Sequence, residues 1–211
     1  MSDKQREDHW DRVYREKAPD QTSWYQVEPS LSLAMIARAG LQPDAAIIDI
    51  GAGRSSLVDR LVEAGFRQLS VLDISSTALE EVRRRLPTDP PVRWIVSDIA
   101  NYCPEQSFSL WHDRALFHFL TEHSDREAYK MALRAALLPA AQLLIGTFAL
   151  DGPLRCSGLE VVRYDADSLT RELGPEFELI EQQDEVHLTP WGSEQRFCFC
   201  RFRYLGGVDT K

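Results

Sequence analysis

The chain is 211 residues long, which suits one domain and would cramp two full-sized ones. Its 44% hydrophobic and 27% charged residues are typical of a folded domain and exclude disordered, collagen-like and coiled-coil classes. A formal net charge of −9 repels nucleic acids and anionic membranes, so neither is an expected partner. The first residues show no apolar signal-peptide region, and no membrane-length apolar run follows, which predicts a cytoplasmic protein.

The four cysteines are predicted to be free thiols, because a cytoplasmic chain stays in a reducing compartment. They are Cys103, Cys156, Cys198 and Cys200. The last two are two residues apart, so on a strand they share one face, which is poor spacing for a zinc site. No metal site is predicted.

Strand and helix patterns alternate through the middle of the chain. An apolar run over residues 45–50 ends at Gly51 and predicts a buried strand, and apolar residues at helical spacing follow it as far as Gly65. The alternation continues with strands over residues 69–73, 92–96, 108–111 and 142–148, and helices over residues 76–86 and about 125–138. This order predicts an α/β fold with a parallel sheet and helices on both faces.

The last third of the chain has a different order of elements. A helix is expected over residues 165–173, followed by strands over residues 177–185 and 195–204. The loop around residues 189–193 is too short for a helical crossover, so these two strands must pair antiparallel at one edge of the sheet. The result is a mostly parallel sheet with one reversed strand.

A glycine turn follows the first predicted strand, in the run Asp49-Ile50-Gly51-Ala52-Gly53. Glycines at a strand-to-helix turn let the backbone approach a ligand closely, and the N–H groups that open the helix face anions. Asp73 ends the second strand, 20 residues after Gly53, where an acid can accept both hydroxyl groups of a ribose. The pattern predicts a nucleotide-like cofactor.

Dinucleotides and S-adenosylmethionine both suit this geometry. A small residue, Ser56, stands where the third glycine of a dinucleotide turn is expected, so an NAD-dependent oxidoreductase stays an alternative. Asp49 favours the other cofactor, since its carboxylate would repel a pyrophosphate and suits the amino group of a methionine moiety. Asp98 follows the third strand and is placed to hold an adenine.

These residues resemble the class I S-adenosylmethionine-dependent methyltransferases over residues 47–204. The resemblance implies a Rossmann-like, seven-stranded sheet with its last strand antiparallel, Asp73 on the ribose, Asp98 on the adenine amine and the glycine turn at the methionine end. It departs from the family at Ser55, where a third glycine is usual. The implied cofactor site comprises Asp49, Gly51, Gly53, Ser55, Asp73, Ile74, Asp98 and Ile99, with Trp10 and Tyr14 covering it; S-adenosylhomocysteine would be the product.

The run Trp111 to Phe119 is similar to the Trp-Asp-Arg-Gly-Ala-Leu run of thiopurine S-methyltransferase-like enzymes, with His112 inserted and the glycine missing. It lacks the Asn-Pro-Pro-Tyr-type motif of many amine-methylating members and matches only part of the Asp-Lys-Gly-Thr run of lysine methyltransferases. His112, placed at the end of the fourth strand, is the candidate general base, with Asp113 beside it. The alternative for His112 is a structural role.

Substrate contacts are expected from the N-terminal segment and from the loop after the fifth strand. Residues 1–28 are predicted to form a lid over a single methyltransferase domain of residues 29–211, because Trp10 and Tyr14 fall on one helical face. Trp24 and Tyr25 are the aromatic candidates for substrate contact. Arg155 and Tyr164 are candidates for recognising an acidic substrate.

The sequence therefore predicts an S-adenosylmethionine-dependent methyltransferase that acts on a small molecule through a thiol, hydroxyl or acid acceptor. Two alternatives stay open, a protein lysine methyltransferase and a non-catalytic protein that binds S-adenosylmethionine. The sequence indicates neither the acceptor atom nor an oligomeric state.

Overall fold

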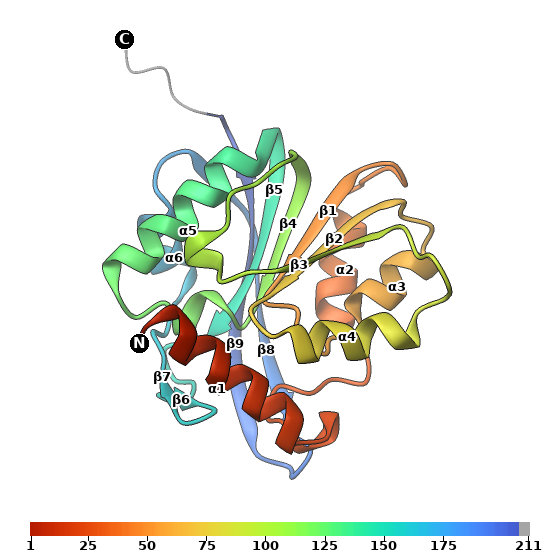
Figure 1. Ribbon diagram of the computed structural model, residues 1–211. Coiled ribbons are helices and arrows are strands. Elements are labelled where there is room, and N and C mark those ends of the chain that lie inside the picture. The colour runs from red at the N-terminus through yellow and green to blue at the C-terminus, as the bar shows by residue number, and fades with distance from the viewer. Residues whose placement is uncertain (207–211) are drawn as a thin grey trace.

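The computed structural model describes residues 1–206, so residues 207–211 of the predicted domain lie outside it (Figure 1). Its centre is a seven-stranded sheet in the order β3-β2-β1-β4-β5-β9-β8. The strands are β1 Ala46–Ile50, β2 Gln68–Asp73, β3 Val92–Val96, β4 Phe108–Arg114, β5 Leu137–Phe148, β8 Phe177–Leu188 and β9 Glu194–Tyr204. A separate two-stranded sheet pairs β6 Arg155–Cys156 with β7 Leu159–Glu160.

Strand pairing confirms the predicted fold class. The first five strands of the sheet pair parallel to one another, as expected for units joined by helical crossovers. The last strand, β9, runs antiparallel to both of its neighbours, β5 and β8. The β8–β9 hairpin therefore lies at one edge, and the sheet is mostly parallel with its last strand reversed.

Helices cover both faces of the sheet. The α-helices are α1 Asp3–Glu16, α2 Ser30–Arg38, α3 Leu57–Glu63, α4 Ser76–Arg85, α5 His123–Ala136 and α6 Ala166–Leu173, and short 3-10 helices are η1 Pro19–Gln21, η2 Ile99–Asn101 and η3 Phe117–Phe119. One buried cluster joins the sheet to α5 and α6, and a second joins it to α2, α3 and α4. Helix α1 lies apart from both layers, across the end of the sheet beside α4 and the β6–β7 hairpin (Figure 1).

Local signals in the sequence set several helix ends. The Ser75 side chain accepts a hydrogen bond from the Ala78 N–H and begins α4, and Asp165 caps α6 in the same way through the Ser168 N–H. Gly65 follows α3 with a φ of 88°, the left-handed conformation that glycine adopts without strain.

Other elements differ from the predictions. Strand β4 continues to Arg114, so His112 and Asp113 lie inside the strand and not after it. Strand β5 begins at Leu137, directly after α5, because Leu137 caps the helix in an extended conformation. The sequence analysis missed α2, and it read as a polar loop the segment that contains the β6–β7 hairpin.

Cys198 and Cys200 share one face of β9, as predicted. The sulfur atoms of Cys198 and Cys200 are 3.7 Å apart, both inside the cluster under α5 and α6, and all four cysteines are free thiols. Among the described residues, no group of three or more potential metal-binding side chains occurs. Over the same part of the chain, no helix is both long and apolar enough to cross a membrane.

Candidate cofactor and active site

A cavity of about 380 Å³ opens beneath α1, at the carboxyl ends of β1 to β4. Its volume falls within the range of small-molecule sites in proteins. Most of the predicted cofactor residues line it, together with two predicted substrate residues: Trp10, Tyr14, Gly51, Asp73, Ile74, Asp98 and Ile99, and Trp24 and Arg155. The parallel strands thus bring together residues that are far apart in the sequence.

The glycine turn after β1 has the backbone conformation for which glycine was expected. Gly51 and Gly53 have φ values of 63° and 52°, in the left-handed region. A Cβ atom on Gly51 would lie 2.5 Å from the Leu116 side chain, and one on Gly53 would lie 2.3 Å from the Tyr14 hydroxyl oxygen. Both glycines are therefore required by close neighbours as well as by the turn.

Asp73 holds the glycine turn from the end of β2. Its two carboxylate oxygens accept hydrogen bonds from the Gly53 N–H at 2.7 Å and the Ser75 N–H at 2.8 Å. Burial raises the pKa of Asp73 to about 6, even though these two backbone bonds favour the charged form. The carboxylate lines the cavity, and each oxygen keeps a lone pair for a ligand hydroxyl group.

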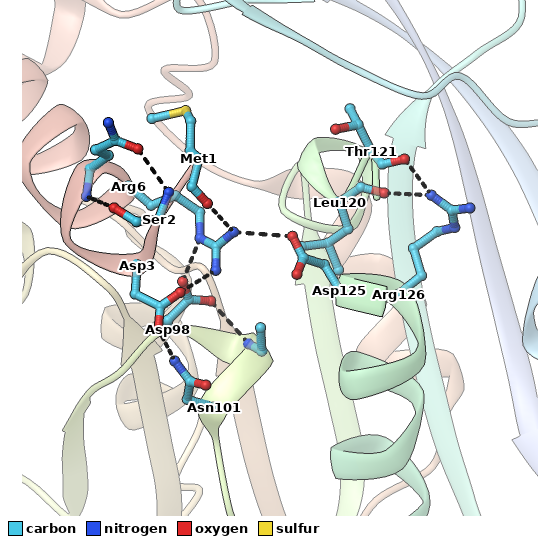
Figure 2. Close-up of polar contacts among 12 residues, drawn as sticks. Met1, Ser2, Asp3, Arg6, Asp98, Asn101, Leu120, Thr121, Asp125 and Arg126 are labelled. Atoms are coloured by element: carbon cyan, nitrogen blue, oxygen red, sulfur yellow. Dashed lines mark hydrogen bonds and ion pairs between the residues drawn. The ribbon is translucent and has the colours of Figure 1, made fainter. Parts of the chain in front are cut away.

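Asp98, at the end of β3, is engaged by an arginine that sequence analysis missed. The Arg6 guanidinium from α1 donates its Nε–H to Asp98 at 2.6 Å and an Nη1–H to Asp125 at 3.1 Å (Figure 2). The other Asp98 oxygen accepts the Ala100 N–H and so caps η2. Arg6 thus ties α1 to two carboxylates at the adenine end of the predicted site.

A smaller cavity of about 60 Å³ adjoins the methionine end of the predicted site, where Asp49, Ser55 and Tyr25 line it. The Asp49 carboxylate lies 2.6 Å from Nδ1 of His112, whose Nε2 lies 2.9 Å from the Ser32 hydroxyl. An ionised carboxylate only accepts, so Nδ1 donates to Asp49, and in a neutral ring Nε2 accepts from the Ser32 hydroxyl. Both ring nitrogens of His112 thus have partners within the protein, and a general base there would have to release Ser32 first.

Two predicted site residues face the apolar core and do not line either cavity. Asp113 is fully buried, and its oxygens accept from the N–H groups of Leu116 and Phe117 and from the Tyr129 hydroxyl. It shapes the turn after β4, and burial raises its pKa to about 6. Tyr164 is buried against Phe117.

His118 is a buried residue of η3. Its Nδ1 accepts the Phe148 N–H at 3.2 Å, and burial lowers its pKa to about 3, so it is neutral at physiological pH.

Helix α1 contacts the rest of the site at its middle and at its end. Asp11 accepts the Ser75 hydroxyl at 2.5 Å, beside the first turn of α4. At the end of α1, Arg54 of the glycine turn donates to the carbonyl oxygens of Tyr14 and Lys17 and pairs with Glu81. Ser75 and Arg54, together with the partners of Arg6, therefore hold the helix over the cavity.

Aromatic rings fill the space between α1 and the strand ends. The Trp10 ring makes edge contacts with Trp24 at 5.7 Å and Phe119 at 5.1 Å between ring centroids, and Tyr14 lies 6.4 Å from Trp24. These four residues line the larger cavity. We call them the aromatic cluster. Phe119 ends the run that begins at Trp111, and the sequence pattern predicted no role for it.

The residues present fit S-adenosylmethionine. Two adjoining cavities are lined by or lie beside glycines that a Cβ atom would block, three carboxylates near strand ends, and the apolar side chains of Ile74 and Ile99. The carboxylates complement the positive charges of the sulfonium and amino groups, whereas they would repel a pyrophosphate.

A methyltransferase domain family matches residues 47–139 of the chain. Among curated proteins, the chain is 30% identical over 78 residues to an eEF1A lysine and N-terminal methyltransferase of Danio rerio, which covers 37% of this chain and 11% of that protein. It is 23% identical over 105 residues to Nodulation protein S of Rhizobium tropici, which covers 50% of this chain and 44% of that protein. The chain therefore spans less than half the length of these relatives.

Solved structures share the fold over nearly the whole chain. One, described for the conversion of a disulfide bond into a thioacetal group during echinomycin biosynthesis, has a TM-score of 0.75 at 20% identity and covers 96% of this chain and 94% of its own. The N-methyltransferase NodS from Bradyrhizobium japonicum WM9, in complex with S-adenosylhomocysteine, has a TM-score of 0.71 at 14% identity. The match covers 93% of this chain and 98% of the NodS chain. The chain thus has the Rossmann-like fold of S-adenosylmethionine-dependent methyltransferases, and residues 47–139 are similar to a methyltransferase domain family.

Proposed function

We propose that the protein is an S-adenosylmethionine-dependent methyltransferase that acts on a small molecule. The observation that carries the proposal is the set of three carboxylates at successive strand ends, Asp49, Asp73 and Asp98, beside a glycine turn that no other residue type would fit. The methyltransferase domain match over the same strands supports it.

In this proposal each strand end holds one part of the cofactor. Asp73 accepts the ribose hydroxyl groups, Asp98 accepts the adenine amine, and Ile74 and Ile99 lie against the adenine ring. Asp49, oriented by His112, attracts the amino group of the methionine moiety. Trp10 and Tyr14 close the site from above.

Bound S-adenosylmethionine supplies an electrophilic methyl group on a sulfonium, which an acceptor displaces in line. The chain itself then has to align the acceptor and exclude water. The aromatic cluster is suited to both tasks, because its rings line the cavity and make edge contacts with one another. Few catalytic side chains are needed.

The role of His112 in this reaction follows from its two partners. With Nδ1 on Asp49 and Nε2 on Ser32, His112 is better placed to orient Asp49 than to take a proton from an acceptor. A thiol or acid acceptor, which ionises without help near neutral pH, suits such a site better than a hydroxyl acceptor. In that case His112→Ala should weaken cofactor binding more than it slows transfer from the loaded enzyme, whereas a base would show the reverse.

A protein lysine acceptor is the second candidate function, because part of the chain is similar to eEF1A lysine and N-terminal methyltransferases from two vertebrates. The position of α1 favours the small molecule, since a protein substrate would need an opening for its side chain past the aromatic cluster. The two functions differ in the acceptor and share the cofactor.

Calorimetry and a labelled-methyl assay test the proposal together. Micromolar binding of S-adenosylhomocysteine without binding of NAD is expected, and NAD binding alone would replace the methyltransferase with an oxidoreductase. Label transferred to small thiols, carboxylic acids or phenols would establish the small-molecule class, and label on protein would establish the second candidate. Tight cofactor binding with no transfer to either pool would identify a non-catalytic binding protein.

A further inference from the structure

The side chain of Arg114 has an unusual environment at the end of β4. It lies where the two cavities meet and lines both of them. Its Nη1 donates to the Trp24 carbonyl oxygen at 3.0 Å, and its guanidinium lies 5.0 Å from the Phe197 ring centre. The Nε and Nη2 atoms are shielded from solvent and have no hydrogen-bond partner among the described residues.

Comparison with other arginines shows why this matters. Arg85 uses its Nε and Nη2 atoms to hold both oxygens of Asp59, and Arg201 uses the same two atoms on Glu181. This edge of the guanidinium is the one that matches a carboxylate with two parallel hydrogen bonds. In Arg114 that edge meets no acceptor of the described chain.

Other buried arginine nitrogens without a hydrogen bond belong to paired side chains. The Nε atoms of Arg54, Arg60, Arg126 and Arg134 also lack a hydrogen bond, but each of these guanidinium groups forms an ion pair with a glutamate within 4 Å. No carboxylate of the described residues lies within that distance of Arg114. A lone charged group away from water is costly for a fold to keep.

Among the carboxylates of the described residues, Glu185 on β8 acts more strongly on the charge of Arg114 than Asp49 does. Its Oε1 accepts from Gln26 at 3.3 Å, while its Oε2 has no partner, so Glu185 is the internal alternative to an external ligand. Burial lowers the pKa of Arg114 to about 10, which still leaves the guanidinium charged at neutral pH. Arg114 thus keeps a cation with two unpaired donors beside the shared wall of the two cavities.

We propose that Arg114 binds a ligand carboxylate through its Nε and Nη2 atoms, where the two cavities meet. The inference rests on the proposed methyltransferase function, which allows two sources of the carboxylate. One is the methionine carboxylate of the cofactor, and the other is a carboxylate of the methyl acceptor, which would make the acceptor an organic acid. The geometry is the same for both.

Calorimetry with four probes separates the two sources. S-adenosylhomocysteine carries the amino acid end and 5′-methylthioadenosine lacks it, while benzoate and benzamide differ by the charge. If the cofactor supplies the carboxylate, Arg114→Gln weakens the binding of S-adenosylhomocysteine about 10- to 100-fold and leaves the affinity for 5′-methylthioadenosine unchanged. If the acceptor supplies it, both nucleosides bind as before, and the cofactor-loaded wild-type protein binds benzoate but not benzamide, a preference that Arg114→Gln removes.

Three outcomes overturn the inference. They are wild-type affinity of Arg114→Gln for every probe, an equal loss for both nucleosides, and an equal loss for benzoate and benzamide. Glu185→Gln is the matched control, and it should leave the probe affinities unchanged; if it reproduces the effects of Arg114→Gln, Glu185 is the true partner. If the wild-type protein binds neither nucleoside, the proposed function fails, and benzoate binding to the free protein still tests Arg114.

Thermal unfolding separates a ligand-binding arginine from a structural one. Arg201→Met removes an arginine whose Nε and Nη2 atoms are paired, so it should lower the Tm of the free protein by several degrees. Arg114→Met should lower the Tm by much less, because no internal ion pair is broken. An equal loss of Tm in both variants would contradict the proposal.

Discussion

The floor and the cover of the larger cavity are held in place by different kinds of bond. The floor, which we define as residues 51–55 with Asp73 and Asp98, is fixed by backbone N–H groups that donate to buried carboxylates. The cover, helix α1, is held mainly by long side chains such as Arg6 and Arg54. The bonds of the floor lie within one layer of the sheet ends, whereas the contacts of the cover join side chains of separate segments, which can part while each segment stays folded. If α1 is the predicted lid, we therefore expect the floor to stay in place and the cover to move.

Removing the cover should have the largest effect on the reaction. Deletion of residues 1–28 is expected to lower methyl transfer by about 10²-fold or more, because acceptor alignment and water exclusion are lost together. The central sheet lies beyond the cut, so circular dichroism should still show a folded core. Trp10→Ala in the full chain is the companion variant and should lower transfer with no loss of folding. Full activity in both variants would show that α1 is not a lid.

Weakening the floor should act on binding. Asp73→Ala is expected to make the binding free energy of S-adenosylhomocysteine about 1.5–3 kcal/mol less favourable, because the charge-assisted hydrogen bonds to the ribose are lost. Asp73→Asn keeps one acceptor oxygen, so its loss of binding affinity should be smaller. Calorimetry checks both variants, with unfolding curves to confirm that the protein remains native. An unchanged dissociation constant for Asp73→Ala would exclude the ribose role.

The raised pKa of Asp73 predicts a pH dependence of the floor. Since burial raises this pKa to about 6, lowering the pH from 7.5 to 5 should protonate the carboxyl group and weaken S-adenosylhomocysteine by about tenfold. Folding stability should respond in the opposite sense, because between about pH 4 and 6 the native state holds protons on Asp73 and Asp113 that the unfolded chain has released. That contribution to stability is present below pH 4 and is lost as the pH rises through 6. Asp73→Asn should flatten this tenfold step in affinity, and a step that persists would come from another group.

Loosening the cover without removing it should have the smallest effect. Arg6→Gln breaks the ion pairs with Asp98 and Asp125, so limited proteolysis of α1 in the free protein should be about two- to fivefold faster. Arg12→Gln on the exposed side of the same helix forms no ion pair among the described residues and serves as the control. Equal proteolysis of the wild type and both variants would mean that Arg6 does not hold the cover.

The floor could be predicted from the sequence, and the cover could be predicted only in part. The floor depends on local signals, such as Gly51 and Gly53 after a buried strand and Asp73 at the next strand end. In a parallel sheet, such strand ends meet at one edge whatever the helices do. Apolar spacing placed Trp10 and Tyr14 on one face of a helix. No short-range pattern indicates that Arg6 meets Asp98, 92 residues away, or that α2 precedes the sheet.

The main error within strands was the end of β4. His112 was expected directly after the fourth strand, facing the cleft; β4 instead continues through Arg114, and His112 lines the smaller cavity with its ring nitrogens bonded to Asp49 and Ser32. Because side chains alternate along a strand, the same extension turns Asp113 into the α5 side of the sheet and Arg114 toward the cavities. The sequence run contained the functional positions, but their roles depend on a strand end that the sequence pattern does not fix.

The strand-end carboxylates also have a consequence for product release in the proposed reaction. A methyl donor arrives with a positive sulfur, and the thioether left after transfer has lost that charge. Asp49, Asp73 and Asp98 therefore attract the spent molecule less strongly than the fresh one, without any change in the shape of the cleft. If the proposed function holds, the same three acids would favour both the entry of the donor and the exit of the product.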